Sequence, residues 1–511
     1  MRERMTANGS RFPPVLAVLA VVAALLAGCM VGPNYRRTPT AEPAAFKEPP
    51  PPSWKSATPR DEIPRGKWWQ VFADPQLDAL EEQVSVSNQS IAQAEAQFRA
   101  ARAAAGVARG GLFPTVTAGA SATRSRSGGG RGGTTLLAGQ TGGSGSGGTT
   151  GTAMAAGSTT SIYQVPLDAS YEVDVWGKVR RMIEGSVATA QASAADLETM
   201  RLSLQAELAV DWFELHGLDA QQQLLATTAD AYKKALDLTT NRYNQGIASG
   251  VDVAQAQTQL ETTRAQAIDL GVQRAQLEHA IAVLTGKAPA DLTITLAPVA
   301  VQPPAVPVAL PSELLERRPD IAANERRMAA ANAQIGVQVA AYYPTISLTA
   351  AGGFESTRLA NLFDWPSRFW SLGASAVETL WNGGARHAAT EQARANYDAA
   401  VAAYRQSVLA AFQDVEDNLS ALRVLDAEAT QQQVAVAAAE RSLALSNYRY
   451  QGGITTYLEV ITAQAAALAN ERTAVDILTR RMTASVNLVK ALGGGWRDSD
   501  LPPGSAILSR R

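Results

Sequence analysis

A twelve-residue segment occurs twice in the chain, and this repeat organises the rest of the sequence. Residues 106–117 read GVARGGLFPTVT, and residues 336–347 read GVQVAAYYPTIS, at an offset of 230 residues. A second pair lies farther along: residues 242–257 read RYNQGIASGVDVAQAQ, and residues 449–464 read RYQGGITTYLEVITAQ, at an offset of 207. Two motifs recurring in the same order indicate two copies of one structural unit.

The two offsets differ by 23 residues, so the first copy carries extra residues between its motifs. Residues 127–160 are rich in Gly, Ser and Thr, which is the composition of a flexible loop. We therefore expect this stretch to be a loop that is longer than its counterpart near residues 356–367.

Alternating apolar and polar residues predict four β-strands, two in each copy. From residue 164 to 175 the odd positions are apolar or aromatic, and the even positions include Asp168, Glu172 and Asp174. Runs of this length suit tilted membrane-crossing strands of about 9–11 residues. A soluble antiparallel sheet with one wet face fits the alternation equally well. If the strands cross a membrane, these three carboxylates are expected to face an aqueous lumen.

Long segments without proline predict helices of unusual length. Residues 178–243 and 383–450 contain no proline, and each helix would be about 100 Å long. In each copy two shorter segments match the long one when placed end to end, namely 75–109 with 251–285, and 312–341 with 457–492. Each copy therefore predicts two parallel helical columns. A plain coiled coil is the alternative, but strands inserted between the helices argue against it.

The N-terminus has the pattern of a lipoprotein signal. Basic residues precede an apolar run at 15–27, which is too short for a comfortable transmembrane helix. The run ends in Leu26-Ala27-Gly28-Cys29, which resembles the bacterial lipobox, and Cys29 is the only cysteine. We expect cleavage before Cys29 and acylation of this residue, with a plain secretory signal as the alternative. Met30 follows, rather than the Asp that retains lipoproteins in the inner membrane, so outer-membrane sorting is expected.

These observations divide the chain into six parts. They are a signal peptide (1–28), a lipid-anchored Pro-rich tether (29–66), a first repeat (67–290), a Pro-rich linker (291–311), a second repeat (312–496) and a C-terminal tail (497–511).

Composition argues against several classes of function. The formal net charge is −2 with 18% charged residues, which does not fit a nucleic-acid partner. A single cysteine leaves no disulfide framework or Cys-based metal cluster. The three histidines, at 216, 279 and 387, follow no ligand spacing and are expected to be isolated surface or helix-face residues. Because no nucleophile–base pair or phosphate loop is present, we expect neither an enzyme nor a bound cofactor.

Four strands cannot close a membrane barrel on their own. An open sheet would leave unpaired N–H and C=O groups in lipid, at a cost of several kcal/mol each. The chain is therefore expected to oligomerise through its sheet edges, and more than two copies would leave a lumen. The periodicity does not choose between three chains and four.

The sequence resembles the TolC/OprM outer-membrane factors, in the NodT-type lipoprotein branch that serves RND-type tripartite efflux systems. The matching motifs are VGPNY at 31–35, WWQVFADPQL at 68–77 and RRPDI at 317–321. The resemblance implies a mainly α protein with membrane β-structure: a homotrimer whose twelve-stranded outer-membrane barrel continues as a periplasmic α-helical barrel. It also implies docking on a periplasmic adaptor that is bound to an inner-membrane transporter.

The resemblance also suggests a periplasmic gate at the two glycine-containing turns. Asp252 and Tyr450 match family positions that link neighbouring coils, and Glu459 matches a position in an acidic ring. Thr455 stands where some members carry a gating Arg, and Thr462 where many carry a ring Asp. Helix-end capping and solvated charge are the alternative roles for these residues.

The function expected from these observations is a passive exit duct for drugs or other small molecules. Its energy would come from an inner-membrane transporter. Two alternatives stay open, an exit duct for type I protein secretion and a non-conducting envelope scaffold. The lipobox and the VGPNY segment favour small-molecule efflux over protein secretion. The exported substrate and the individual pump and adaptor are not encoded in any of these motifs.

Overall fold

The computed structural model describes residues 30–39, 46–48, 67–126, 159–297, 303–304 and 314–509. The predicted signal peptide, Cys29, most of the tether and linker, and nearly all of the Gly-rich loop lie outside the described residues. The chain divides into two compact units. One contains residues 107–183 and 334–391, and the other contains most of the helical residues. Each unit is described by itself below.

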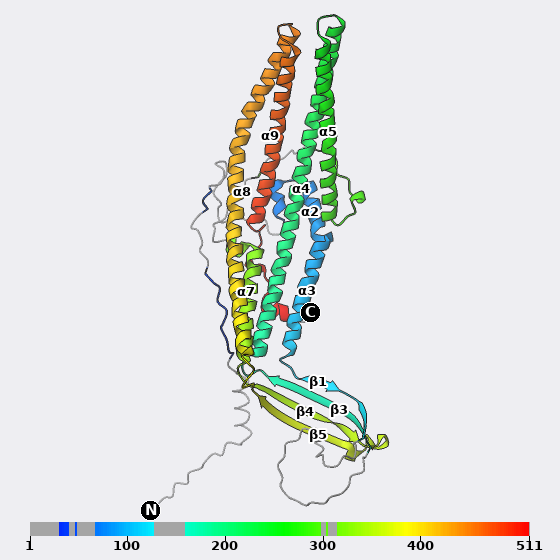
Figure 1. Ribbon diagram of the computed structural model, residues 1–511, viewed down its shortest axis with the longest axis vertical. Coiled ribbons are helices and arrows are strands. Elements are labelled where there is room, and N and C mark those ends of the chain that lie inside the picture. Colours follow the sequence, from blue (N-terminus) through cyan, green and yellow to red (C-terminus); the bar gives the residue numbers. More distant parts are fainter. Residues whose placement is uncertain are drawn as a thin grey trace, which may run out of the picture. The chain divides into compact units, whose positions relative to one another are not determined.

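The first unit is built on one antiparallel sheet (Figure 1). Its strands lie in the order β1-β3-β4-β5, with β2 also on β3. Both β1 and β2 pair with the same edge of β3 in one continuous register, so together they occupy a single strand position. The sheet therefore has the four strand positions that the alternation predicts. The strands are β1 (Thr115–Ala118), β2 (Ser121–Arg126), β3 (Thr159–Val173), β4 (Thr345–Ser356) and β5 (Arg368–Val377).

A proline in the middle of β3 explains the interruption between β1 and β2. Pro166 has no N–H to donate, although its carbonyl accepts a hydrogen bond from the Gly119 N–H at 3.0 Å. On the other side of β3, Pro166 lies opposite Gly353. A Cβ on Gly353 would come within 2.2 Å of the Val165 carbonyl oxygen. Glycine is required there because the two backbones approach so closely.

The two faces of the sheet differ in polarity. Directly paired residues share a face, and the register places apolar partners opposite one another on one side and polar partners on the other. The apolar face carries Val116, Ala118, Ala122, Leu167, Ala169, Tyr171, Leu348, Ala350, Phe354, Trp370, Leu372 and Ala374. The polar face carries Thr115, Thr117, Ser121, Gln164, Asp168, Ser170, Glu172, Ser347, Thr349, Glu355 and Ser375.

Two long helical hairpins dominate the second unit and lie side by side in Figure 1. In the first hairpin α4 (Lys178–Asn244, 67 residues) turns into α5 (Gly250–Leu284, 35 residues). In the second, α8 (Ala385–Gln451, 67 residues) turns into α9 (Tyr457–Ala491, 35 residues). The equal lengths confirm the duplication and the proline-free helices expected from the sequence. No helix among the described residues is both long enough and apolar enough to span a membrane.

The second column of each copy is formed from two shorter segments end to end, as expected, but the first of these segments contains a break that the sequence did not suggest. In the first copy this segment comprises α2 (Pro75–Ser87) and α3 (Gln89–Gly110), separated by Asn88. Asn88 caps α3 through its side-chain oxygen, and its amide donates to the Leu284 carbonyl at 2.8 Å. The start of α3 therefore meets the end of α5.

The second copy repeats this junction. There α6 (Leu314–Arg317) and α7 (Pro319–Ala340) are separated by Arg318, since a residue before proline disfavours the helical conformation. Arg318 donates to the Ala491 carbonyl at 3.2 Å, near the end of α9. The predicted single helices at 75–109 and 312–341 are wrong at these breaks, while the end-to-end arrangement is correct.

The main hydrophobic core lies where the repeats meet. The motif WWQVF forms η1 (Trp68–Phe72), and its aromatic side chains are buried. Phe72 lies 5.0 Å from Phe213 of α4, measured between ring centroids. The same core includes Tyr404 of α8 and Met482 of α9, so it joins both copies. The remaining short elements are η2 (Pro289–Asp291), η4 (Leu359–Asn361), η5 (Trp365–Ser367), η6 (Asp498–Asp500) and α10 (Gly504–Leu508).

Candidate functional site

The ends of the two hairpins have the same backbone structure. In both turns a glycine adopts a positive φ, 76° at Gly246 and 71° at Gly453, which L-residues rarely adopt. Ile247 donates to the Arg242 carbonyl at 2.8 Å and Ile454 to the Arg449 carbonyl at 2.9 Å. These bonds satisfy carbonyls that the helix ends leave free. The two turns therefore form equivalent tips, as their matching sequences predicted.

In the first tip, Asp252 is engaged in a helix cap. Its carboxylate accepts from the Ser249 N–H at 2.9 Å and from the Ser249 hydroxyl at 3.0 Å. The Ser249 hydroxyl oxygen in turn accepts from the Asp252 N–H at 3.2 Å, which completes a capping box at the start of α5. The capping alternative raised for Asp252 is therefore realised in the structure.

In the second tip, Glu459 pairs with its own hairpin. The Arg449 guanidinium lies 2.6 Å from the Glu459 carboxylate, and both side chains are substantially exposed. The Thr455 hydroxyl also donates to this carboxylate. The family resemblance implies a gating arginine at position 455 in some members, whereas in this chain Thr455 binds the Glu459 carboxylate through a neutral hydroxyl.

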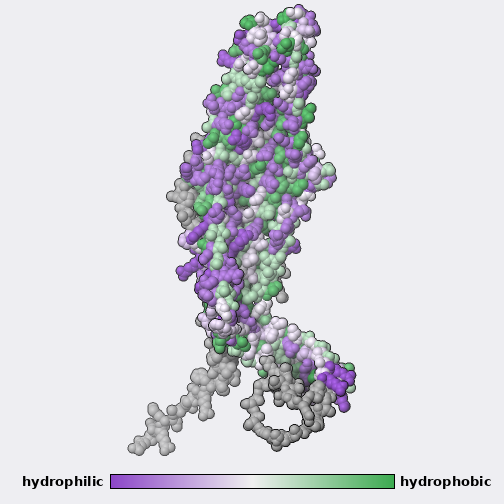
Figure 2. Space-filling view, viewed as in Figure 1, coloured by the Kyte–Doolittle hydropathy of each residue, from purple (hydrophilic) through white to green (hydrophobic). Residues whose placement is uncertain are grey.

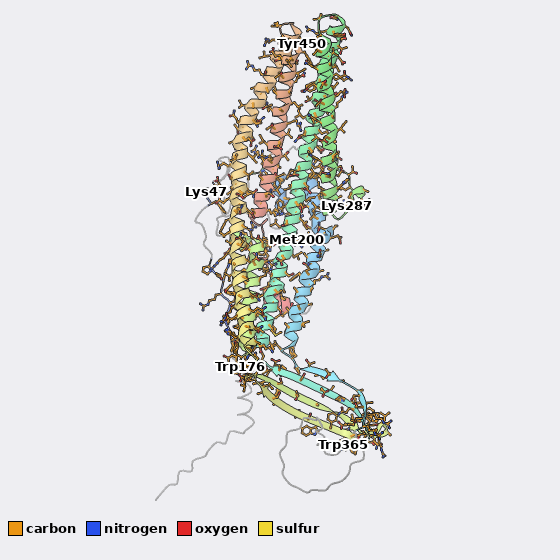
Figure 3. The ribbon with its side chains drawn as sticks, in the orientation of Figure 1. Lys47, Trp176, Met200, Lys287, Trp365 and Tyr450 are labelled. Carbon is orange, nitrogen blue, oxygen red and sulfur yellow. The ribbon has the colours of Figure 1, made fainter. Side chains whose placement is uncertain are left out.

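Tyr450 is the buried centre of the tip. Only 6% of the residue is exposed, and its ring lies 5.2 Å from the ring of Tyr457. Burial is the largest effect that raises the pKa of Tyr457 to about 12, with smaller contributions from nearby acidic and phenolic groups. These tyrosines pack with Ala256 and Val460 into a small apolar cluster that joins α5 to the second hairpin. Figure 3 labels Tyr450 at this end of the helices.

Arg242 connects the first tip to the second, and the sequence did not single it out. Its guanidinium carbon lies 4.7 Å from the centre of the Tyr450 ring. It also donates to the carbonyls of Tyr450 at 3.0 Å and Gln451 at 3.2 Å. Asp252 and Tyr450, which the resemblance assigns to links between coils, form no hydrogen bond with each other within the described residues: Asp252 binds Ser249, and the Tyr450 hydroxyl has no hydrogen-bond partner there.

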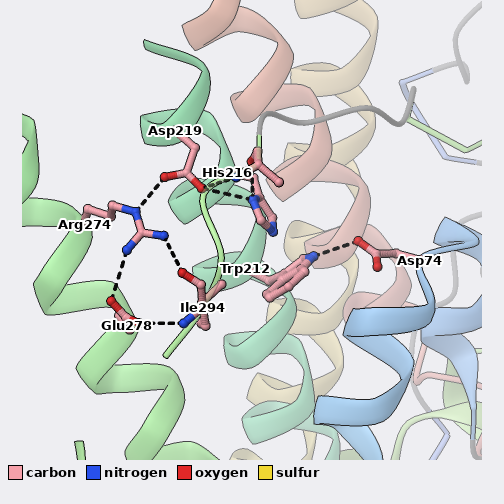
Figure 4. A network of polar contacts seen from close by, with 8 residues as sticks. Asp74, Trp212, His216, Asp219, Arg274, Glu278 and Ile294 are labelled. Carbon is pink, nitrogen blue, oxygen red and sulfur yellow. Dashed lines mark hydrogen bonds and ion pairs between the residues drawn. The ribbon is translucent and has the colours of Figure 1, made fainter. Parts of the chain in front are cut away.

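A second polar network lies far from the tips and fastens the segment that follows α5 (Figure 4). Asp219 of α4 is fully buried and accepts from Arg274 at 2.7 Å and from the Ala297 N–H at 3.0 Å. Burial alone would raise the pKa of Asp219, but hydrogen bonds from His216, Ala297 and Arg274 outweigh it and lower the pKa. Glu278 of α5 binds the Ile294 N–H at 2.6 Å.

His216 belongs to this network, which corrects the expectation of a surface or helix-face histidine. It is buried, its Nδ1 lies 2.5 Å from the Ala297 carbonyl oxygen, and its ring contacts that of Trp212. Trp212 in turn donates to Asp74 at 2.8 Å. The contacts of His216 with Ala297 and of Trp212 with Asp74 join residues 81 and 138 positions apart, so the histidine belongs to a tertiary contact between distant segments. Within the described ranges no group of acidic, histidine or cysteine side chains is arranged to hold a metal.

One carboxylate on α4 has an unusual environment. Burial, and to a smaller extent the neighbouring carboxylates Glu207 and Glu214, raise the pKa of Asp211 to about 7. These residues lie one helical turn on either side of Asp211, which places all three on one face. The sequence offered no reason to single out this group, because acidic residues at this spacing are common on exposed helices.

The three carboxylates predicted to line a lumen have different positions. Asp168 and Glu172 lie on the polar face of the sheet, and Glu172 pairs with Lys178 at 3.2 Å. Asp174 lies beyond the end of β3. Its largely buried carboxylate accepts from the N–H groups of Val179 at 2.9 Å and Arg180 at 3.0 Å, so it caps α4. The prediction for Asp174 therefore needs correction, since helix capping accounts for this residue.

Comparison with known proteins places these features in a family. Residues 80–287 and 310–494 match the model of the family described as outer membrane efflux protein. The probable efflux pump outer membrane protein TtgC of Pseudomonas putida is 32% identical over 94% of this chain and 96% of its own length. The pyoverdine export outer membrane protein OpmQ of Pseudomonas aeruginosa is 31% identical over 84% of this chain and 88% of its own.

Solved structures agree with this assignment. The outer-membrane channel OprN superimposes with a TM-score of 0.81 at 30% identity, over 92% of this chain and all of its own. The open-state MtrE channel of Neisseria gonorrhoeae gives a TM-score of 0.78 at 26% identity over 92% of this chain and 99% of its own. The predicted fold class, the outer-membrane location and the efflux function are confirmed. The chain is a member of the outer membrane efflux protein family.

Proposed function

We propose that three copies of this chain assemble into a passive exit duct in the outer membrane, with an inner-membrane transporter supplying the energy through a periplasmic adaptor. The observation that carries this proposal is the pairing of a four-position sheet, polar on one face only, with two equal hairpins of 67 and 35 residues. In a single chain the described sheet has two unpaired edges and the helical hairpins have exposed faces. A closed ring of several chains around a water-filled axis would cover both.

The sheet supplies the argument for assembly. The outer edges of β1/β2 and of β5 have no partner strand in the described chain. In lipid, the unpaired N–H and C=O groups of these edges would be costly, and closing the sheet removes the cost. Edge pairing between neighbouring copies would give a twelve-stranded barrel with Asp168 and Glu172 on its inner, polar face.

The partners and substrate class follow from the family rather than from a contact in this chain. TtgC is called an efflux pump protein and OpmQ a pyoverdine exporter. Because one of these relatives is an efflux pump protein and the other exports pyoverdine, we assign small molecules in general as the cargo class of this chain. We assign the selection among them to the transporter. A homotrimer, a periplasmic adaptor, an RND-type transporter and outer-membrane lipid are the proposed partners.

Planar-bilayer recordings of purified full-length protein test the duct. We expect discrete ohmic channels whose appearance depends on intact trimers. Trimers that insert into the bilayer and carry no current would support the scaffold alternative and contradict the duct. Heat-dissociated protein is the matched control, since it contains the same chain without the assembly.

We further propose that Cys29 is the mature N-terminus and carries acyl chains such as palmitate. The lipobox and the absence of any other cysteine support this assignment. Mass spectrometry of the purified protein should give a chain lacking residues 1–28 with added lipid mass. An unmodified Met1, or an unlipidated end elsewhere, contradicts the proposal.

The Gly-rich stretch 127–160 is proposed to be an extracellular loop. The stretch follows the end of β2 and leads into the start of β3, and neither of these strand ends is joined to a helix. External protease on intact cells should cut there first. Cutting that requires broken cells would place the stretch on the periplasmic side and reverse the proposed topology.

The tip is proposed to be the periplasmic gate, with a revised set of contacts. Asp252, Tyr450 and Glu459 remain the candidate gate residues, and Arg242 joins them because it holds the first hairpin to the second. Near a three-fold axis, copies of Glu459 would repel one another. The salt bridge to Arg449 offsets part of the Glu459 charge, and the Arg242–Tyr450 contact opposes the outward movement of helices that the repulsion favours.

A further inference from the structure

Three arginines lie at one end of the apolar face of the sheet. The apolar row of β1 and β2 runs through Val116, Ala118 and Ala122 and ends in Arg124 and Arg126, which keep the same alternation. The apolar row of β5, formed by Trp370, Leu372 and Ala374, begins at Arg368. Arg368 is paired with Phe354 of β4, so it shares the apolar face.

This end of the sheet is the one remote from the helices along the chain. Strand β1 starts soon after α3, and β3 ends just before α4, so both have their helix connections at the opposite end. Resting on the proposed function, in which the helices are periplasmic, the arginines lie at the level of the outer leaflet. Arginine on a lipid-facing surface costs about 2–4 kcal/mol at the bilayer midplane and little near the interface. The headgroup layer is therefore where these side chains are compatible with the membrane.

The arginines are available to an external anion. All three are exposed, and among the described residues no carboxylate forms an ion pair with them. Arg368 lies over the Trp365 ring, 3.7 Å from its centre, and this contact fixes the guanidinium beside an exposed indole. Figure 2 shows hydrophilic surface gathered at this end of the sheet, and Figure 3 labels Trp365 there.

Assembly would bring the arginines together. Within one chain β2 and β5 occupy opposite edges of the sheet. In a closed ring β2 of one copy pairs with β5 of the next, where neighbouring strands lie roughly 5 Å apart. Arg124 and Arg126 would then lie at the same end of the barrel as Arg368 of the neighbouring copy, on the adjacent strand and on the same face. Each of the three boundaries would gain three cations, with aromatic side chains next to Arg368.

We propose that this arginine rim binds the phosphate groups of lipid A, the phosphorylated glycolipid of the outer leaflet. Guanidinium groups form two parallel hydrogen bonds with phosphate oxygens, and the arginine–phosphate pair is stronger than a neutral hydrogen bond. The exposed Trp370 and Leu372 on the same face contact the acyl chains below the headgroup. The rim is a lipid-binding surface built by two copies of the chain.

Native mass spectrometry of the full-length trimer in detergent tests the rim. The probes are lipid A, lipid A without its phosphates, and phosphatidylglycerol. The main variant replaces Arg124, Arg126 and Arg368 by Gln, and the matched control replaces three exposed cations of the helical unit, Lys233, Lys287 and Arg441, by Gln. A second variant replaces the three rim arginines by Lys, which keeps the charge and loses the planar fork.

The expected loss is roughly fivefold in lipid A affinity per arginine removed, hence on the order of a hundredfold for the triple Gln variant. The Lys variant should retain part of the affinity, and the control should match wild type. Removing the lipid phosphates should weaken binding to wild type but not to the triple Gln variant. If the triple variant does not form trimers, Arg368→Gln alone should still bind about fivefold less.

Equal lipid A binding by wild type and the Gln variants would overturn the proposal. So would equal affinity for phosphatidylglycerol, since that outcome means a general attraction to anionic lipid. Conductance recorded on the same preparations separates this proposal from the duct itself. A conducting trimer that ignores lipid A contradicts only the rim, whereas a non-conducting trimer that binds lipid A contradicts only the duct.

Discussion

The two tips share a backbone and differ in how their side chains are used. In the first tip Tyr243 is 51% exposed and Arg242 reaches across to the second hairpin. In the second tip Tyr450 is 6% exposed and Arg449 turns back to its own Glu459. The two hairpins are equal in length because of the duplication, but their side chains have diverged. The first hairpin donates through Arg242, and the second accepts through its backbone carbonyls and the Tyr450 ring.

This difference indicates which hairpin is free to move. The second tip has two contacts within its own hairpin, the Arg449–Glu459 salt bridge and the Tyr450–Tyr457 ring contact. The first tip depends on its capping box and on the contacts of Arg242 with its neighbour. Substitutions at equivalent positions of the two tips test this interpretation directly.

The largest difference is expected between the equivalent tyrosines. Tyr450→Ala empties a buried site and should destabilise the tip by about 3 kcal/mol, whereas Tyr243→Ala should cost less than about 0.5 kcal/mol. Hydrogen exchange of the last turns of α4 and α8 measures the effect. Equal loss of protection in the two variants would contradict the difference in burial.

The arginines should differ next. Arg242→Gln removes a cation–π contact and two hydrogen bonds to carbonyls, for about 1–2 kcal/mol of local stability. Arg449→Gln removes one exposed ion pair, which typically contributes about 0–1 kcal/mol. Disulfide trapping between cysteines placed on α4 and α8 near the tips should slow for the first variant only. Slower trapping for both would mean that both arginines join the hairpins.

The two N-caps give a smaller contrast. Ser249→Ala breaks the capping box of α5 and should cost about 1 kcal/mol. Thr456, at the equivalent position before α9, makes no side-chain cap bond, so Thr456→Ala should be close to neutral. Hydrogen exchange in the first turns of α5 and α9 distinguishes them. A larger effect for Thr456 would reverse the assignment.

The last contrast is between Asp211 of α4 and the equivalent residue of α8, and it depends on pH. At the offset of 207 residues the equivalent residue is Asn418, which does not titrate. Because the folded-state pKa of Asp211 is raised to about 7, folding is favoured when the group is protonated, and that stability is lost as pH rises from about 4 through 7.

Asp211→Asn should therefore stabilise the protein at pH 8 and have little effect at pH 4. Solvent screening limits the gain to no more than about 1 kcal/mol for a group this accessible. Thermal unfolding of the trimer at the two pH values measures it, with Asn418→Asp as the reciprocal variant. A gain at pH 4 that equals the gain at pH 8 would contradict the raised pKa.

Sequence periodicity was sufficient for the repeat, the long helices and the four strand positions. Each of these features depends on a local pattern repeated over ten residues or more, so the signal accumulates. The breaks at Asn88 and Arg318 were missed because a single residue decides each of them. Asn88 is an ordinary helix residue in the sequence until its side chain meets the end of α5, almost 200 positions away.

The candidate site was predicted less completely. The tips were located correctly, yet Arg242 and the His216 network were not anticipated, since their partners lie roughly 80 to 200 positions along the chain. The alternation in the sequence continues past the end of β3, so it wrongly included Asp174 in the strand. Its role as a cap becomes clear only from the position at which α4 begins. Local chemistry identifies the residue types, while their partners are set by the tertiary fold.

Single-channel conductance of wild-type trimers and of Arg242→Gln trimers is the most direct test of the central claim. That claim is that the chain forms a duct whose tip is held narrow by the joining of the two hairpins at Tyr450. Wild type should conduct weakly, and the variant should conduct several times better because its first hairpin is released. Equal conductance from intact trimers of both would contradict the claim.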